Sequence, residues 1–219
     1  MVIYRRSLLC ILTAGVAPAQ SDRASLGLKE ALSIGLNTAV DLTGRLDGYF
    51  RNEVIKILMP EKLKPLVKGL TMIGMRGKVD KFVMAMNRAA EQAAPLAKPI
   101  FADAIRTFNF NDARGLLAGG DTAITDFFKN TTKEPLAFAF RPPVVDAMGQ
   151  TGATKQFNDL IGRYQKLPFA SKNVVNIEDY VVGKALDGLF YMVAQEETRI
   201  RKNPVARVTS VLREVFGRR

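Results

Sequence analysis

Residues 78–108 read KVDKFVMAMNRAAEQAAPLAKPIFADAIRTF, and their pattern gives the clearest indication of the fold class. Apolar side chains recur in it every three or four positions, which is the period of one face of an α-helix. Alanines crowd its middle, and their small side chains allow neighbouring helices to approach closely. Pro95 and Pro99 each remove a backbone donor, so we expect the helix to bend or split there. The stretch predicts a central helical seam, whose members are Val79, Phe82, Val83, Met86, Ala90, Ala93, Ala97, Ile100 and Ala104.

The segments on both sides of this seam also favour helix over strand. Spacings of three and four recur, while sustained alternation of apolar and polar residues is almost absent. The apolar, β-branched run at 54–59 is the one place where a short extended segment is expected. Helices are predicted at 25–43, 60–73, 135–148 and 154–167. Three more are predicted to begin at the capping residues Asn111, Asp121 and Asn176, and a last one to begin after a break at Asn203-Pro204. A loop is predicted at 168–176.

The predicted fold class is all-α, a single-domain multi-helix bundle with short connecting loops. The chain has 219 residues, which is enough for one self-sufficient hydrophobic core. No apolar run reaches the roughly 18 residues that a membrane span requires, so no transmembrane span is expected. Residues 20–219 are therefore predicted to form one helical domain.

Residues 1–19 have the layout of a secretory signal peptide. Arg5 and Arg6 precede a short apolar run at 7–16, and Ala17-Pro18-Ala19 has the small–any–small spacing of a signal-peptidase site. We therefore expect cleavage before Gln20 and a periplasmic or otherwise exported protein. The general secretory and twin-arginine routes both remain open, and organelle targeting is the alternative address.

Missing residue types exclude whole classes of chemistry. The chain has no histidine, and its single cysteine, Cys10, lies within the predicted signal peptide. A mature protein without Cys and His has no disulfide, no thiol nucleophile, no Ser–His pair and no ordinary zinc site. A metal would need oxygen ligands alone, and no Asp-x-Asp spacing is present, so neither a metal nor a cofactor is predicted.

Several polar and charged residues lie on predicted helices that are otherwise apolar. Three of them stand among the alanines of the central seam, and one lies between leucines of a later helix. Charges at such positions must be paired to be tolerated. We predict a buried polar cluster, and its candidate members are Asn87, Arg88, Glu91, Asp187, Glu197 and Arg201. A solvated helix face with weak ion pairs is the alternative.

The last segment of the chain is basic and amphipathic. The chain has a net charge of +11, and removal of Arg5 and Arg6 would leave 11 − 2 = +9. A net positive charge of this size attracts the protein to anionic surfaces. The apolar side of the segment either docks on the domain or lies on an anionic membrane. The candidate anionic-surface contacts are Arg199, Lys202, Arg207 and Arg213.

Short strings along the chain match a known pattern in their order and spacing. They include MNRAAE at 86–91, TDFF at 125–128, KALDGLF at 184–190 and VFG at 215–217. Together they resemble the domain of unknown function 4197 family of exported bacterial proteins, over roughly residues 26–217. The resemblance implies a helical fold and export. None of the strings is a catalytic signature, and the family implies no established activity.

These observations favour a non-enzymatic exported envelope protein that binds a partner, or an apolar or anionic ligand, between its helices. Anionic lipid and an envelope protein are the candidate partners. The alternative is an enzyme or hard-cation site that uses the carboxylates of Glu91, Asp187 and Glu197. Nucleic-acid binding is third and is disfavoured, because the chain has no tryptophan and export would separate it from nucleic acid.

Overall fold

The computed structural model describes residues 18–108, 115–164 and 176–203, together with Val205, Arg207 and Arg213. Within these ranges the chain forms helices and no strand, which confirms the predicted all-α class. The α-helices are α1 (Pro18–Gly44), α2 (Lys64–Met72), α3 (Arg76–Ala93), α4 (Ala97–Thr107), α6 (Ala123–Gln150), α7 (Ala153–Tyr164) and α8 (Ile177–Lys202). Two short 3₁₀ helices, η1 (Glu61–Leu63) and η2 (Ala94–Leu96), precede α2 and α4.

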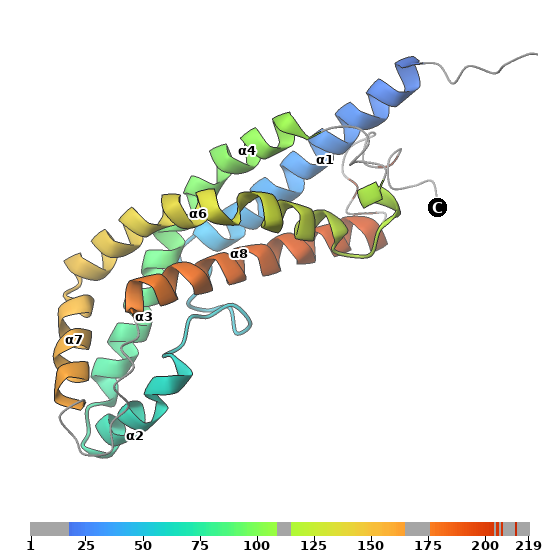
Figure 1. Cartoon of the computed structure of the whole chain (residues 1–219). Coiled ribbons are helices and arrows are strands. Elements are labelled where there is room, and N and C mark those ends of the chain that lie inside the picture. Colours follow the sequence, from blue (N-terminus) through green and yellow to red (C-terminus); the bar gives the residue numbers. More distant parts are fainter. Residues whose placement is uncertain are drawn as a thin grey trace, which may run out of the picture.

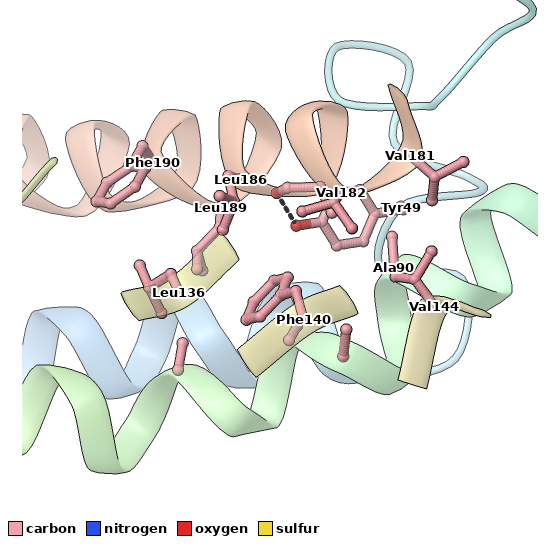
Figure 2. Close-up of a cluster of buried hydrophobic side chains, with 14 of the residues drawn as sticks. Tyr49, Ala90, Leu136, Phe140, Val144, Val181, Val182, Leu186, Leu189 and Phe190 are labelled. Atoms are coloured by element: carbon pink, nitrogen blue, oxygen red, sulfur yellow. Dashed lines mark hydrogen bonds between the residues drawn. The ribbon is translucent and has the colours of Figure 1, made fainter. Parts of the chain in front are cut away.

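The long helices enclose one main hydrophobic core. Helix α6 packs on α8 and α3, while α1 packs on α8 and α4. Helices α2 and α7 lie at the end of the molecule away from the start of α1 (Figure 1). In the core, Leu136 and Phe140 of α6 face Leu186 and Leu189 of α8 (Figure 2). The bundle thus buries its apolar faces between α6, α8, α3 and α1.

The alanine-rich seam lies where α3 continues into α4. The predicted split at Pro95 is confirmed, because η2 interrupts the α-helix there. Pro99 lies in the first turn of α4, where a missing backbone N–H is tolerated. A Cβ at Gly44 would lie 3.1 Å from the Pro95 ring, so α1 and η2 are in close contact. The fully buried alanines of this stretch are Ala89, Ala90, Ala93, Ala94 and Ala97.

The prediction that a separate helix begins at Pro135 is wrong. Helix α6 runs unbroken from Ala123 to Gln150 with Pro135, Pro142 and Pro143 inside it. Each interior proline removes a backbone hydrogen bond and costs about 3 kcal/mol. Packing offsets this cost, because the core-facing side chains of the same helix, such as Phe140, are fully buried. Figure 1 shows α6 as an arched helix, as expected for prolines along one element.

Other predicted boundaries agree with the structure or lie outside the described residues. Helix α1 ends at Gly44 as expected but already begins at Pro18. Asn176 caps α8, because its side chain accepts hydrogen bonds from the backbone N–H groups of Glu178 and Asp179. Asn203 ends α8. The predicted cap Asn111, most of the loop at 168–176 and most of the tail helix lie outside the described residues.

Residues 45–60 connect α1 to η1 without a helix or a strand. The expected extended run at 54–59 therefore forms no sheet among the described residues. Asp47 has a φ of 66°, a left-handed conformation that is uncommon for residues other than glycine. The segment crosses α3 and α8, and we call residues 45–60 the pinned segment because buried side chains of these helices fix its backbone.

Candidate functional site

Asn87 of α3 holds the last part of the pinned segment. Its side chain is fully buried and bonds both backbone groups of Ile57. The Oδ1 atom accepts from the Ile57 N–H at 2.8 Å, and the Nδ2 atom donates to the Ile57 carbonyl at 2.8 Å. A second Nδ2 bond goes to the carbonyl of Val83 at 2.7 Å. Asn87 thus replaces the strand partner that Ile57 lacks, because a buried backbone group must be bonded.

Glu91, one helical turn further along α3, holds the start of the segment. Its Oε1 atom accepts hydrogen bonds from the backbone N–H groups of Tyr49 at 3.1 Å and Phe50 at 3.0 Å. Its Oε2 atom lies 2.6 Å from Nη1 of Arg88. The other terminal nitrogen of Arg88 lies 2.6 Å from the carboxylate of Asp47. The charges of Glu91 and Asp47 are therefore paired through one half-buried arginine.

Tyr49 anchors the segment in the hydrophobic core. Its side chain is fully buried, and its hydroxyl donates to the carbonyl of Ala185 in α8 at 2.6 Å (Figure 2). Burial raises the pKa of the Tyr49 hydroxyl well above its ordinary value, and the charge of Glu91 raises it further. Gly188 leaves room for the ring, because a Cβ there would lie 2.6 Å from Cε1 of Tyr49. The hydroxyl is thus a neutral structural donor.

The outer side of the pinned segment presents apolar side chains to solvent. Leu46, Val54 and Leu58 are 74, 64 and 59 % exposed. Val54 and Leu58 line an open groove of about 410 Å³, together with Tyr191 of α8. An adjoining hollow of about 640 Å³ is lined by Leu46 and Val54. The segment is therefore fixed on its inner side and displays apolar groups on its outer side.

A second buried polar group joins α8 to the start of α6. The carboxylate of Glu197 accepts from the backbone N–H of Ile124 at 3.1 Å and of Thr125 at 2.8 Å. It also accepts from the hydroxyl of Thr125 at 2.7 Å. Thr122, the residue before α6, makes no capping bond of its own. Glu197 therefore caps α6 from a neighbouring helix, where a negative charge also interacts well with the helix dipole.

Arg201 completes this second group. Its Nη2 atom lies 2.8 Å from Oε1 of Glu197, and only 2 % of its side chain is exposed. The guanidinium also donates to the carbonyls of Leu116 at 2.8 Å and Leu117 at 3.1 Å, in the helical turn at 115–118. The ion pair thus connects three parts of the chain, namely this turn, the start of α6 and the end of α8.

The predicted polar residues form two separate groups and not one cluster. Asn87, Arg88 and Glu91 hold the pinned segment, whereas Glu197 and Arg201 hold α6. The expectation that Asp187 is buried is wrong, because 61 % of its side chain is exposed and it pairs with Lys184. Position 187 faces outward although Leu186 and Leu189 point into the core. Among the described residues, no three carboxylates converge on a metal-sized site.

The four candidate anionic-surface contacts all bond to the protein itself. Two form ion pairs with carboxylates, and two donate to backbone carbonyls near the end of α8. In the order Arg199, Lys202, Arg207 and Arg213, the partners are Glu196, Asp121, the carbonyls of Ile200 and Arg201, and the carbonyl of Arg207. Asp121 thus pairs with a lysine instead of capping α6 as predicted.

A small cavity lies between α1, α6 and α8. Its volume is about 30 Å³, and its walls are mostly apolar, with Leu32, Leu36 and Val193 among them. Glu197 is the one carboxylate of its lining. A space of this size holds about two water molecules. This cavity therefore has no room for an organic ligand.

Sequence reasoning missed Tyr49, Asp47 and Gly188. A glycine inside an otherwise apolar helix indicates close approach of another group. Gly188 in the string KALDGLF carried that signal. The left-handed Asp47 and the buried ring of Tyr49 had no comparable signal, because both depend on a segment without periodicity.

The fold and the two buried groups define an all-α protein in which polar side chains fix the backbone of other segments. Within the described ranges, no helix is long and apolar enough to cross a membrane. The chain belongs to the family described as protein of unknown function (DUF4197), whose model matches residues 19–217. This confirms the family resemblance of the sequence strings. No curated protein and no solved structure matches the chain.

Proposed function

We propose that this protein is a non-enzymatic, exported binding protein, and that its partner is a protein of the cell envelope. The binding surface is the outer side of the pinned segment with the adjoining face of α8. The apolar side chains that the partner would cover are those of Leu46, Val54, Leu58 and Tyr191.

The opposite character of the two sides of the pinned segment carries this proposal. Buried charged and amide groups cost free energy unless each is bonded, and the inner side uses Asn87, Glu91 and Tyr49 in this way. A segment without helical hydrogen bonds is otherwise mobile. Fixing it in advance reduces the entropy that a partner must overcome on binding. Exposed leucines and valine on such a fixed surface are typical of a binding site.

The buried carboxylates support binding over catalysis. Each oxygen of Glu91 and of Glu197 already accepts at least one hydrogen bond from the protein. The hydroxyl of Tyr49 is buried and bonded. A structural role accounts for all three groups, and a general acid or base must instead reach a substrate.

Export is the second part of the proposal. The basic, apolar and small-residue series at 1–19 supports it, and the family model begins at residue 19, beside the expected cleavage site. Sequencing the N-terminus of protein made in its own host should give Gln20. Intact chains that begin at Met1 in the cytoplasm would contradict export.

Site-specific photo-crosslinking in the native host tests the binding surface. A photoreactive residue placed at Leu46 or Leu58 should give a discrete crosslinked product. Phe138 on α6 is the matched control, because it is 83 % exposed. The same product from position 138, or no product from positions 46 and 58, would contradict the proposed surface.

A further inference from the structure

The turn between α2 and α3 has a defined backbone geometry. The N–H of Met75 donates to the carbonyl of Leu70 at 2.8 Å, and the N–H of Gly74 donates to that of Thr71 at 3.1 Å. Gly74 has a φ of 78°, which favours glycine. These two bonds around a left-handed glycine form a Schellman motif. The turn is therefore a fixed helix end and not an irregular loop.

This geometry directs two large apolar side chains into solvent. Met72 is 80 % exposed and Ile73 is 68 % exposed at the end of α2. Leu70, one turn earlier, is buried and attaches the helix to α3. Figure 1 shows α2 and the start of α3 at one end of the molecule. The most exposed apolar side chains of α2 therefore lie at a projecting end.

Positive charge surrounds this apolar tip. Residues 61–81 contain six basic residues, Lys62, Lys64, Lys68, Arg76, Lys78 and Lys81, and two acidic ones, Glu61 and Asp80. All six basic residues are exposed. Two ion pairs, Lys64 with Glu61 and Arg76 with Asp80, use both acids. Within the described part of the chain, Lys68 and Lys78 have no ion-pair partner.

We propose that the α2–α3 turn binds the surface of an anionic lipid bilayer. Met72 and Ile73 enter the region between the headgroups and the acyl chains, while Lys68 and Lys78 remain among the anionic headgroups. Apolar side chains ringed by basic residues match the two layers of such a surface. This site differs from the predicted tail contacts, because Arg199, Lys202, Arg207 and Arg213 bond to the protein itself.

Charge favours a bilayer over another protein as the occupant. A flat anionic surface satisfies the unpaired lysines before and after the tip at once, and the net positive charge, which is +11 for the whole chain and 11 − 2 = +9 without Arg5 and Arg6, adds long-range attraction. The turn is also distinct from the pinned segment, so the proposal stands independently of the proposed protein partner.

A fluorescent probe at the tip tests insertion directly. Cys10→Ser removes the single cysteine of the chain, and Met72→Cys then allows labelling with an environment-sensitive dye. Vesicles containing about one third phosphatidylglycerol in phosphatidylcholine should shift the emission to the blue and raise its intensity. The same dye at Phe138→Cys, a position of similar exposure at 83 %, should show neither change. No change at position 72, or equal changes at both positions, would overturn the proposal.

Charge variants test the electrostatic part. Lys68→Glu with Lys78→Glu should reduce anionic-vesicle binding of the full chain, measured from the dye signal at position 72, by at least tenfold. Lys129→Glu with Lys133→Glu on α6 changes the net charge equally and should reduce it much less. Binding of the unaltered tip should also weaken as salt rises from 50 to 500 mM. Equal losses in both variants, or equal binding to pure phosphatidylcholine, would overturn the proposal.

Discussion

Glu197 and Arg201 form an ion pair of 2.8 Å in which 5 % and 2 % of the two side chains are exposed. Each partner also bonds the backbone of a segment more than 70 residues away in sequence. The pair therefore stabilises the packing of α8 on α6 and on the turn at 115–118. Removing one partner leaves a buried charge without its counterion, which costs much more than the loss of an exposed pair.

Arg201→Met should destabilise the protein by about 3–5 kcal/mol, because it leaves Glu197 buried and unpaired and frees two carbonyls. Urea denaturation monitored by circular dichroism measures the change. Arg106→Met is the control, since both side chains of its ion pair with Asp103 are exposed, at 76 and 68 %, and we expect a cost below about 1 kcal/mol. Similar costs for the two variants would contradict the structural role of the buried pair.

Glu91→Ala should cost about 3 kcal/mol or more, because the backbone N–H groups of Tyr49 and Phe50 lose their acceptor and Arg88 loses a counterion. Asp187→Ala, which changes an exposed carboxylate, should cost less than about 0.5 kcal/mol. Urea melts of the two variants measure the two losses of stability. A loss below about 0.5 kcal/mol for Glu91→Ala would show that its bonds to the pinned segment contribute little.

Gly188→Ala should destabilise the protein by about 1–3 kcal/mol, because the added Cβ would meet the Tyr49 ring and Ile55. Gly183→Ala provides a matched control on the same helix, since a Cβ there has no atom within 4 Å. Alanine favours helix over glycine, so Gly183→Ala should stabilise by up to about 1 kcal/mol. Thermal melts of the two variants should therefore shift in opposite directions. A neutral Gly188→Ala would contradict the close contact with Tyr49.

Stability should depend on Tyr49 at alkaline pH. Burial raises the pKa of Tyr49 in the folded state above the unfolded value of about 10. The contribution of the Tyr49 hydroxyl to the free energy of unfolding is therefore complete below pH 10. It is lost as pH rises above 10, by about 1.4 kcal/mol per pH unit. At pH 8 the free energy of unfolding of the parent protein should exceed that of the Tyr49→Phe variant by about 1 kcal/mol, because of the bond to Ala185. Urea melts should show that this difference in stability has disappeared by about pH 11. A difference in stability that stays constant with pH would exclude a raised pKa of Tyr49.

The helical class and the alanine seam follow from the sequence, because both depend on local periodicity. Residues 78–108 showed the buried face of α3 and α4 and the break at Pro95. The continuity of α6 through three prolines did not follow, because burial of side chains such as Phe140 offsets a local cost. Tertiary packing of this kind cannot be read from one segment.

The candidate site could be predicted only in part. Asn87 and Glu91, which stand among the alanines of the seam, are buried as expected, and so are Glu197 and Arg201, which stand four residues apart on one helix. Their partners did not follow, since Glu197 caps a helix that begins more than 70 residues earlier. Asp187 also has apolar neighbours, yet the rotation of about 100° per residue places it on the opposite face from Leu189.

Native-state hydrogen exchange of the amides of Tyr49, Phe50 and Ile57 measures whether buried side chains fix the pinned segment. These three N–H groups lie in a segment without helix or strand, and they donate to the buried side chains of Glu91 and Asn87. If those side chains fix the pinned segment, the three amides should exchange as slowly as the core amides of α3 and α8. Exchange of all three within seconds at neutral pH, while the core helices remain protected, would show that Glu91 and Asn87 do not fix the segment.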